Sequence, residues 1–407
     1  MPPTHLNNSI TSQLGTESHK QKSAEITHKK QKLVLFVVSD IDRAIAFEWI
    51  AQASLKWSDF KVAFVFLCPK MPKSGELIRQ MGINVVFFEV LGKRSWILTF
   101  FRLAALIRQL KPIIIHCHLI QANLIGLSAA FFFRHSHPIY TRHHSTLHHV
   151  YHPKGVFLDR YSNFLAKKII SISDSVTSVL SVMENVPRSK IVEIPHGFDL
   201  TMFSSIDLNR VKKFRHRHQL PAHVRIVGVV SRFVDWKGIK YIVRAFSKLV
   251  VDFPDLHLLL LNASGPGTAE IDALLQELPS ACWSKVLFED DIVSAYASMT
   301  VLVHAPIDKD SEAFGQVYVE ALASGIPSVF TLSGISTAFV RDEENALVVP
   351  FKDAKAIEVA LRRLLNDFQL CKKLATQGPL SVRSEFNLDR MTERLYQLYQ
   401  RLTDEKD

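Results

Sequence analysis

The sequence predicts an α/β protein with two doubly wound domains that face a central cleft. Continuous apolar runs ending in polar residues recur along the chain, beginning with LVLFVVSD at residues 33–40. Such runs are typical of parallel strands that are buried on both faces. Helical patterns separate the runs, and the alternation starts again at VRIVGVV, residues 224–230. Strands that alternate with helices favour a parallel sheet, and two such series predict two domains with a ligand cleft between them.

The composition describes a globular protein that is large enough for two cores. The 407 residues are 47% hydrophobic and 22% charged, which excludes a disordered chain. Four cysteines lie far apart and show no metal-ligand spacing, which indicates a reducing compartment: Cys68, Cys117, Cys282 and Cys371. The formal charge of +10 indicates an anionic partner. No nucleic-acid-binding motif is present, so nucleic acid is not the expected partner.

No segment of the sequence is expected to span a membrane. The first 30 residues are polar and basic and lack the apolar core of a secretory signal, so we expect a disordered tail. The longest apolar stretch, residues 113–133, is interrupted by His116, His118, Gln121 and Asn123. We therefore interpret it as a strand, a loop and a helix.

The most informative segment is SEAFGQVYVEALASGIPSVF, residues 311–330. It predicts a loop that carries Glu312, a helix that opens near Gly315, and a strand at its end, with Glu320 about two turns into the helix. The first amides of a helix lack backbone partners and attract anions. Carboxylates on either side of Phe314 and Gly315 could flank a phosphate-bearing ligand and hold its hydroxyl groups. The alternative is two solvated carboxylates around an ordinary helix cap.

A second segment, VGVVSRFVDWKGI at residues 227–239, supplies positive charge. It predicts a buried strand, a polar turn with Arg232 and Lys237, and then a helix. Open α/β sheets bind ligands at such strand-to-helix connections. A planar guanidinium and an ammonium together suit a diphosphate. The alternative is two solvent-facing basic residues.

Together these segments resemble the family 4 glycosyltransferases, which are retaining, nucleotide-sugar-dependent enzymes with the GT-B fold. The family pattern has an Arg and a Lys in a strand-to-helix turn, then a Glu, seven residues and a second Glu. The same order occurs here as Arg232, Lys237, Glu312 and Glu320. Further similar segments are ISISDSV (170–176), IPHGFD (194–199) and ENALVVPFKD (344–353). The resemblance covers most of residues 33–385, and the ordered set of motifs is more specific than any single one.

The resemblance implies a division of the chain into two Rossmann-like domains. Residues 31–203 would form the acceptor-side domain, and residues 204–385 the domain that binds the nucleotide sugar. The last segment, residues 386–407, would form a helix that returns to the first domain. We expect the connection between the domains in the polar segment 199–223.

The resemblance also implies roles for three side chains around the donor sugar. Glu320 would hold the ribose hydroxyls, and Glu312 would hold hydroxyls of the transferred sugar. His118, which follows a predicted strand, would contact that sugar near its anomeric centre. For His118 the alternative is a structural histidine that is satisfied by its neighbours.

The diphosphate of the donor would be neutralised without a metal ion. Arg232, Lys237 and the main-chain amides near Phe314 and Gly315 would supply the positive charge. The donor would be a UDP-, GDP- or ADP-sugar, and no further cofactor is expected. The pair Asp290–Asp291 is interpreted as a strand end and a helix cap rather than as a metal-binding motif.

The loop after the first strand departs from the family pattern, which often has glycines there. Residues 39–47 contain none, and Asp40, Asp42 and Arg43 occupy the turn. Either this loop uses side chains, or the enzyme grips its acceptor differently. The second departure is LNASGPG, residues 261–267, which is looser than the usual glycine pattern.

Two other segments have open interpretations. Residues 135–152 contain seven histidines, for which metal binding, acceptor binding and a plain surface loop are alternatives. The helical segment KRSWILTFFRLAALIRQLK, residues 93–111, mixes aromatic and basic side chains. It either lies on an anionic membrane or packs against the core.

The leading hypothesis is a cytoplasmic, retaining glycosyltransferase that builds a cell-surface polysaccharide or glycolipid. Its expected partners are a nucleotide-sugar donor, a glycan or lipid-linked acceptor, and an anionic membrane at whose inner face it would make peripheral contact. The alternatives are an inverting GT-B transferase, a sugar-nucleotide epimerase and a non-catalytic nucleotide-sugar-binding protein. The intact set of Arg232, Lys237 and Glu320 argues against the last of these.

Overall fold

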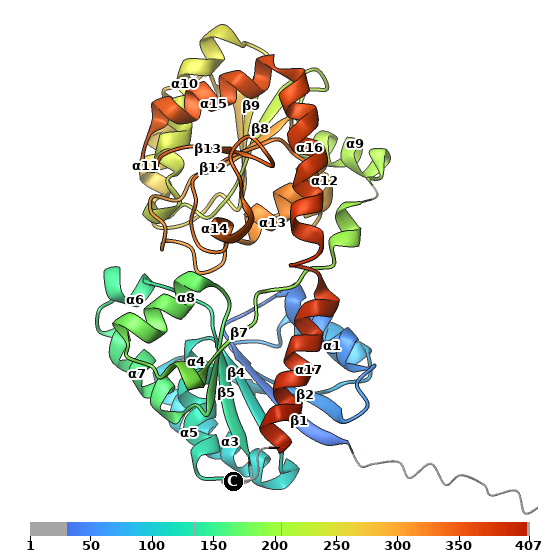
Figure 1. The fold of residues 1–407 in the computed structure, drawn as a ribbon, viewed down its shortest axis with the longest axis vertical. Helices are drawn as coiled ribbons and strands as arrows, with labels where there is room; N and C mark the ends of the chain where they lie inside the picture. Colours follow the sequence, from blue (N-terminus) through green and yellow to red (C-terminus); the bar gives the residue numbers. More distant parts are fainter. Residues whose placement is uncertain (1–30, 134–135, 205, 405–407) are drawn as a thin grey trace, which may run out of the picture.

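The computed structural model describes residues 31–133, 136–204 and 206–404. The tail expected at residues 1–30 lies outside the described residues. Two parallel β-sheets, each with helices packed around it, lie one above the other in Figure 1. The two doubly wound domains predicted from the sequence are therefore confirmed. No helix within the described ranges is long and apolar enough to cross a membrane.

The first sheet has the strand order β3-β2-β1-β4-β5-β6-β7, and every pairing in it is parallel. Residues 34–38 in β1 are fully buried, which explains their unbroken apolar run. The strand order reverses between β1 and β4, and ligands bind at such switch points. The strands are β1 (Lys32–Ser39), β2 (Phe60–Cys68), β3 (Asn84–Glu89), β4 (Ile114–His118), β5 (His137–Arg142), β6 (Lys168–Ser171) and β7 (Ile191–Glu193).

Short and long helices surround this sheet. They are α1 (Ile45–Ser54), α2 (Lys73–Gln80), α3 (Trp96–Leu110), α4 (Ile120–Ala122), α5 (Ser128–Phe131), α6 (Leu147–Val150), α7 (Gly155–Leu165) and α8 (Asp174–Ser178). Two π-helical turns, η2 (Asn123–Leu127) and η3 (Val179–Met183), continue α4 and α8. Three 3₁₀ turns are η1 (Lys93–Ser95), η4 (Arg188–Lys190) and η5 (Leu200–Phe203). The interpretation of residues 113–133 as a strand, a loop and a helix is consistent with β4 followed by α4, η2 and α5.

The second sheet has the order β10-β9-β8-β11-β12-β13 and reverses between β8 and β11. Its strands are β8 (Arg225–Val230), β9 (Leu256–Leu261), β10 (Trp283–Val286), β11 (Val301–His304), β12 (Ser328–Phe330) and β13 (Leu347–Val348). Its helices are α9 (Leu208–Arg217), α10 (Ile239–Asp252), α11 (Thr268–Gln276), α12 (Ile292–Ala297), α13 (Gln316–Ala323), α14 (Ser336–Phe339), α15 (Ala354–Asn366) and α16 (Phe368–Arg383), with 3₁₀ turns η6 (Asp235–Lys237) and η7 (Ser280–Cys282).

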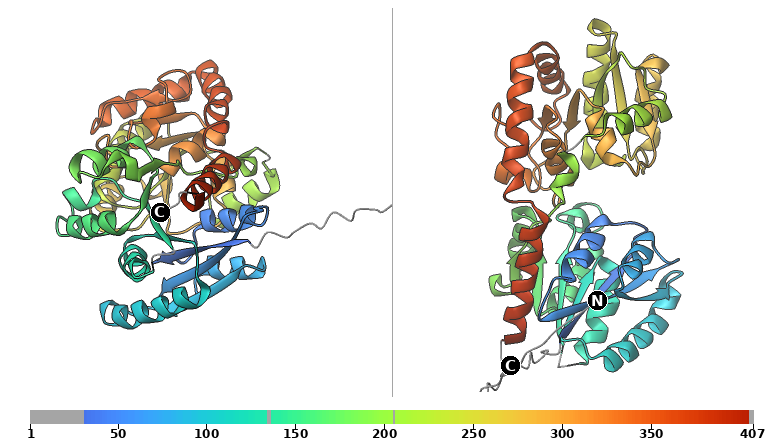
Figure 2. Two further views of the ribbon diagram at one scale, coloured as in Figure 1. Left: turned by 60° about the horizontal axis from the view of Figure 1, so that its bottom comes forward. Right: turned by 90° about the vertical axis from the view of Figure 1, so that its right-hand side faces the viewer.

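The last helix, α17 (Leu388–Asp404), packs on the first domain. Figure 2 shows α16 and α17 following one side of the two domains in turn. Tyr399 of α17 is fully buried, and its hydroxyl lies 2.8 Å from His116 Nδ1 in β4. Phe198 pairs with Asn387, so the two crossings of the chain between the domains lie side by side. The final helix thus closes the core of the first sheet.

The segment 199–223 is more than the polar connection that its composition predicts. It contains α9, which belongs with the second domain because Phe214 is fully buried there and Arg210 Nη2 lies 2.7 Å from Asp291 Oδ1. His218 Nε2 lies 2.6 Å from Glu289 Oε2 on the same side. Since α9 is charged around most of its circumference, its apolar periodicity is weak, which is why the sequence pattern misses it.

Candidate active site

A cleft with a volume of about 710 Å³ lies between the two domains and is lined by both. It opens where the strand order of the second sheet reverses, at the loops that follow β8 and β11. First-domain residues reach it from the loop after β5 and from α6. Six of the seven residues predicted for the site line this cleft: Arg232, Lys237, Glu312, Phe314, Gly315 and Glu320.

The two predicted cations lie in the connection between β8 and α10, as the sequence indicates. Arg232 is exposed to the cleft, and its guanidinium has no hydrogen bond or ion pair to any residue that the structure describes. Lys237 is the last residue of η6 and is followed by Gly238, whose φ is +67°. A Cβ on Gly238 would lie 2.1 Å from the carbonyl oxygen of Ala305, so this turn requires glycine. The close approach brings Lys237 beside the loop after β11.

Glu312 is held by that loop at the floor of the cleft. Its Oε1 forms an ion pair with Lys237 and lies 3.1 Å from His304 Nε2, at the end of β11. Burial alone would raise the pKa of Glu312, but the charge of Lys237 and the hydrogen bond from His304 lower it to about 2. Burial lowers the pKa of His304, although Glu312 opposes this effect. The carboxylate is therefore ionised and fixed in place.

Glu320 lines the same cleft and is the fifth residue of α13, a little more than one turn into the helix. The helix begins where the sequence predicts, but five residues at about 3.6 per turn make less than the predicted two turns. Its Oε2 accepts a hydrogen bond of 2.8 Å from the hydroxyl of Tyr296 in α12. Burial raises the pKa of Glu320, and the bond from Tyr296 offsets part of that rise. Oε1 accepts no hydrogen bond from the described residues and is available to a ligand.

The N-terminus of α13 faces the same space. Gly315 is its N-cap with φ at +89°, and a Cβ there would lie 2.6 Å from the ring of Tyr318. Phe314 is buried, with its ring centroid 5.0 Å from that of His196 and 6.0 Å from that of Phe198. The side chain of Phe314 therefore joins the two domains, and only its main chain is left for an anion.

His118, the seventh predicted residue, lies in an adjoining apolar pocket of about 210 Å³ in the first domain. It is 4% exposed, and its Nδ1 lies 3.0 Å from Nε2 of His143. Its Nε2 is buried without a partner among the described residues. His143 and His196 line both the pocket and the cleft, so the two spaces adjoin at these rings.

His116 differs from His118, although β4 places both on the same face, as the strand alternation predicts. Both ring nitrogens of His116 are bonded at 2.8 Å, one to Tyr399 and one to Thr141. Burial lowers the pKa of His116 to about 3 and that of His196 to about 4, and it holds the pKa of His118 well below its ordinary value. The pocket is thus lined by neutral imidazoles, and Nε2 of His118 is a buried nitrogen without a hydrogen-bond partner among the described residues.

The glycine-free loop after β1 contributes through a side chain. Arg43 Nη1 lies 2.9 Å from Asp290 Oδ1 of the second domain, across the mouth of the cleft. Asp291 accepts from the amide of Ser294 and caps α12, as expected for that acidic pair. Asp40 adopts a left-handed backbone conformation with φ at +52°. This loop therefore bridges the domains by an ion pair.

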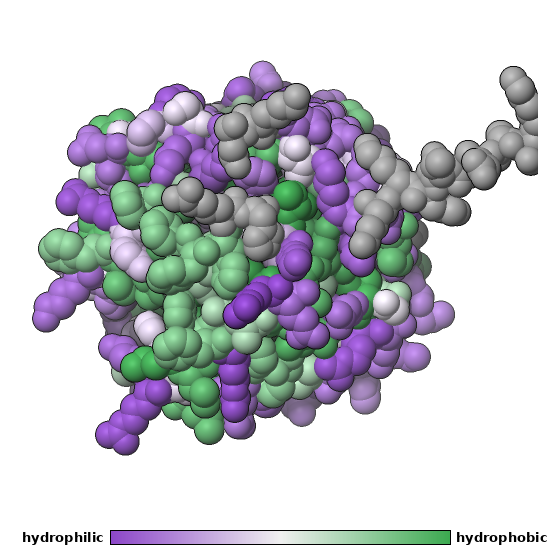
Figure 3. Space-filling view, turned by 90° about the horizontal axis from the view of Figure 1, so that it is seen from below, coloured by the Kyte–Doolittle hydropathy of each residue, from purple (hydrophilic) through white to green (hydrophobic). Residues whose placement is uncertain are grey.

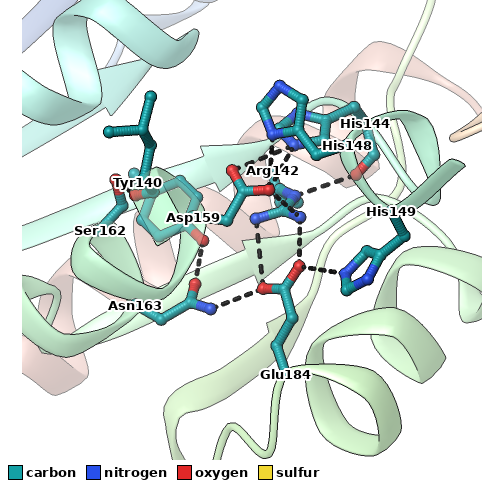
Figure 4. A network of polar contacts seen from close by, with 10 residues as sticks. Tyr140, Arg142, His144, His148, His149, Asp159, Ser162, Asn163 and Glu184 are labelled. Carbon is teal, nitrogen blue, oxygen red and sulfur yellow. Dashed lines mark hydrogen bonds and ion pairs between the residues drawn. The ribbon is translucent and has the colours of Figure 1, made fainter. Parts of the chain in front are cut away.

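The histidine-rich loop surrounds a buried charge network (Figure 4). The guanidinium of Arg142 is 1% exposed and lies 2.9 Å from Asp159 Oδ2 and 2.6 Å from Glu184 Oε1. Asp159 also accepts from His148 at 2.7 Å, and Glu184 is bonded to His149 at 3.1 Å. The loop is thus anchored to α7 and η3, and most of its described histidines are not free surface groups.

Part of this network has the chemical composition of a metal site. Donor atoms of His144, His148 and Asp159 lie within 4.8 Å of one another. However, Asp159 also receives the buried guanidinium of Arg142, which would repel a cation bound to the same carboxylate. These residues fit a charge-compensated structural cluster better than a metal centre.

Sequence reasoning missed three side chains that complete the site, namely His196, Tyr296 and His304, and it left the role of His143 open within the histidine-rich loop. His196 belongs to the IPHGFD motif, and His143 belongs to the histidine-rich loop, so a signal was present for both. Tyr296 and His304 lie in segments whose sequence pattern is that of an ordinary helix and an ordinary strand. They join the site only because the fold brings them beside Glu320 and Glu312.

Two family models match the chain in succession. One, described as Glycosyltransferase Family 4, matches residues 57–202, and the other, Glycosyl transferases group 1, matches residues 211–380. The capsular polysaccharide biosynthesis glycosyltransferase CapM of Staphylococcus aureus is 27% identical over 71% of this chain and 77% of CapM. A D-inositol 3-phosphate glycosyltransferase of Corynebacterium urealyticum is 25% identical over 53% of this chain. The match covers 52% of that relative, so the chain spans about half of its length.

The fold is similar to that of Anabaena HepE in complex with UDP and glucose, with a TM-score of 0.77 at 18% identity over 91% of this chain and 99% of that chain. These findings define a two-domain glycosyltransferase of the GT-B class. Within that class, the chain belongs to glycosyltransferase family 4. A UDP-N-acetylglucosamine 2-epimerase also shares the architecture, with a TM-score of 0.61 at 14% identity over 93% of this chain and 99% of that chain. The architecture alone therefore does not specify the reaction.

Proposed function

We propose that this glycosyltransferase moves a sugar, with retained anomeric configuration, from a nucleotide-diphosphate sugar to a hydroxyl of a glycan or lipid-linked acceptor. The product would belong to a cell-surface polysaccharide or glycolipid. The observation that carries the proposal is the convergence of two cations, a helix N-terminus and two carboxylates on one cleft. CapM acts in capsular polysaccharide biosynthesis by its name, and HepE was solved with UDP, which supports the donor and product classes.

The second domain would hold the donor. Arg232, which has no protein partner within the described residues, and Lys237 would bind the diphosphate, together with the amides that follow Phe314 at the start of α13. Glu320 would bind ribose hydroxyls through its unbonded Oε1. The proposal covers donors whose nucleoside is uridine, guanosine or adenosine.

Glu312 would hold hydroxyls of the transferred sugar rather than attack it. Its pKa of about 2 keeps it ionised, but Lys237 and His304 already occupy Oε1. A carboxylate that is paired in this way is a poor nucleophile and a good hydrogen-bond acceptor. An oxygen of the leaving phosphate would accept the proton of the acceptor hydroxyl as that hydroxyl attacks on the same face of the sugar.

The first domain would present the acceptor. The unbonded Nε2 of His118 lies in the pocket that adjoins the cleft at His143, so it could reach a hydroxyl near the anomeric centre. Burial keeps this imidazole neutral, which suits a hydrogen-bonding role rather than a charged one. His118 would thus orient the sugar or the incoming hydroxyl.

The transfer would need no divalent ion. Charge that develops on a leaving diphosphate must be neutralised, and Arg232, Lys237 and the end of α13 can do this by preorganised electrostatics. We place the reaction in the cytoplasm, at the inner face of an anionic membrane, where a lipid-linked acceptor would be available.

The test begins with a thermal-shift screen of UDP-, GDP- and ADP-sugars to identify the donor. The stabilising donor is then incubated with the protein, and the anomeric configuration of the released or transferred sugar is followed by NMR. Retained configuration supports the proposal. Inverted configuration indicates an inverting transferase, C2 epimerisation without release indicates an epimerase, and tight binding without turnover indicates a non-catalytic protein. Each of these three outcomes overturns the proposal.

A further inference from the structure

One face of the first domain carries an unusual concentration of exposed aromatic side chains. Ile97 and Phe101 project from α3, Phe131 and the following Phe132 from the end of α5, and Phe157 and Phe164 from α7. Each of these six, here called the phenylalanine face, is between 57% and 74% exposed. Figure 3 shows the molecule from below the view of Figure 1, where hydrophobic residues gather over a broad area of the first domain.

The three helices form one surface rather than three separate spots. The ring of Phe100 in α3 lies 6.2 Å from that of Phe132, the residue that follows α5. The hydroxyls of Ser128 in α5 and Tyr161 in α7 lie 2.9 Å apart. An apolar area of this extent on a folded protein marks an interaction site, because single exposed apolar residues are usually scattered.

Helix α3 shows why packing inside the molecule does not explain the face. Its inward side buries Thr99, Leu103 and Ile107, at spacings of four residues. Ile97 and Phe101, also four residues apart, lie on a different side and are exposed. The sequence left open whether this helix packs on the core or lies on a membrane. The structure gives it one buried side for the core and a second apolar side that is mostly exposed.

The charge around the phenylalanine face has a single sign. Residues 91–133 include Lys93, Arg94, Arg102, Arg108 and Lys111 and contain no aspartate or glutamate. All five of these basic residues are exposed. The only acidic residue of α7, Asp159, is 3% exposed and is bound by Arg142. The surface of α3, α5 and α7 therefore offers cations and apolar rings but no exposed carboxylate.

We infer that the phenylalanine face docks on an anionic lipid bilayer, with its rings in the interfacial region and its basic residues against the headgroups. A second copy of the chain is the poorer occupant. A two-fold interface would place this face against itself, so Arg102 and Arg108 would meet like charges with no carboxylate to pair them. An anionic lipid surface complements both the charge and the apolar area.

The position of the face relative to the cleft gives docking a consequence that rests on the proposed function. Val150 and Tyr151, at the end of α6, line the cleft and are 60% and 38% exposed. Helix α7 begins a few residues later and is held against α6, because a Cβ on Gly155 would lie 2.6 Å from the ring of His148. The docked face would thus be joined through α6 to the mouth of the cleft, where a lipid-linked acceptor has to enter.

Vesicle flotation tests docking without donor or acceptor. We expect the parent protein to float with phosphatidylglycerol-containing vesicles, to float roughly tenfold less with pure phosphatidylcholine vesicles, and to dissociate as salt is raised. The double variant Phe157→Asp/Phe164→Asp should lose roughly tenfold of the bound fraction. The matched control Phe368→Asp, on α16 and 75% exposed, should float like the parent.

Two double charge-reversal variants test whether the basic residues near the phenylalanine face attract the lipid headgroups, or whether the net charge of the whole protein does. Arg102→Glu/Arg108→Glu should weaken flotation, whereas Lys372→Glu/Lys373→Glu on α16, with the same change in net charge, should not. Thermal unfolding and nucleotide-diphosphate binding serve as fold controls for all variants.

Failure of the parent to float with anionic vesicles, or equal loss in face and control variants, would overturn docking. A second result would also overturn docking. If the parent sediments as a dimer, and the face variants sediment as monomers but float like the parent, the phenylalanine face is covered by a second copy of the chain. Transfer to a soluble acceptor is measured separately. If the parent does not float but still transfers sugar to the soluble acceptor, docking alone is rejected; if the parent floats but transfers no sugar, the proposed function alone is rejected.

Discussion

The ammonium of Lys237 and the carboxylate of Glu312 form an ion pair at the floor of the cleft, between the loop after β8 and the loop after β11. The two residues lie far apart in the sequence, so no local pattern predicts their pairing. The turn at Gly238 brings Lys237 close to the loop after β11 and so allows the ion pair. Because the pair is largely buried, the lysine has two tasks: it balances Glu312 in the protein and it would face the donor phosphates.

Replacing the two cations should therefore have different effects. Arg232→Ala should weaken nucleotide-diphosphate binding by about 1.5–3 kcal/mol, the value of a charge-assisted contact, with little change in thermal stability. Lys237→Ala should weaken binding similarly and also lower the melting temperature, because it leaves Glu312 buried without its cation. Calorimetric titration and thermal unfolding measure the two effects. Arg244→Ala on α10, an exposed arginine, is the control. Parent-like binding by both cleft variants would refute the phosphate clamp.

The two carboxylates should divide the donor between them. Glu320→Ala should reduce affinity for the free nucleoside diphosphate, because it removes the ribose contact. Glu312→Ala should leave that affinity nearly unchanged and reduce turnover, because its contacts are to the sugar. Titration with nucleoside diphosphate, followed by steady-state kinetics, distinguishes the roles. Equal losses of nucleoside diphosphate affinity would contradict this division.

The low pKa of Glu312 makes stability depend on pH. Its folded pKa of about 2 lies below the ordinary 4.5, so its charge stabilises the fold above pH 4.5, and this contribution is lost as the pH falls toward 2. At 1.36 kcal/mol per pKa unit, the full contribution is about 3 kcal/mol. Urea unfolding of the parent and Glu312→Gln between pH 3.5 and pH 7 should show a difference that shrinks as the pH falls.

Glu320 provides the opposite sign in the same experiment. Burial raises its folded pKa, so its charge destabilises the fold at neutral pH, and this penalty disappears as the carboxyl is protonated at lower pH. Glu320→Gln should therefore be at least as stable as the parent at pH 7.

The Glu312 prediction has its own contrary outcome. If the difference in free energy of unfolding between the parent and Glu312→Gln stays constant over the pH range, the Lys237–Glu312 ion pair does not cause the pH dependence of stability.

Chelation should not abolish transfer. Arg232, Lys237 and the N-terminus of α13 supply the positive charge that a divalent ion would otherwise provide. We expect the turnover rate with EDTA to match the rate without it. Loss of activity that magnesium or manganese restores would show that the diphosphate is neutralised by metal instead.

The sequence predicted the parts of this protein that depend on local pattern. Buried parallel strands produce unbroken apolar runs, and the helices between them follow the periodicity of one buried side, so the sequence alone predicts both domains. The loops after β8 and β11 carry Arg232, Lys237 and Glu312, and parallel strands deliver their loops to one edge of a sheet. The strand assignment therefore places these residues at one edge of the second sheet, whereas their convergence also depends on β8 lying beside β11.

Only the tertiary structure decided which side chains complete the site. His304 and Tyr296 resemble ordinary strand and helix residues. His304 meets Glu312 because the loop after β11 folds back onto the end of its own strand, and the hydroxyl of Tyr296 in α12 reaches Glu320 in α13. The same holds for the phenylalanine face, since Phe101 and Phe157 lie more than fifty positions apart and share a surface only after α3, α5 and α7 pack together. A local pattern specifies that an element forms and which side is apolar. Which partner covers that side, or leaves it open to a membrane, depends on contacts between distant segments that no local pattern contains.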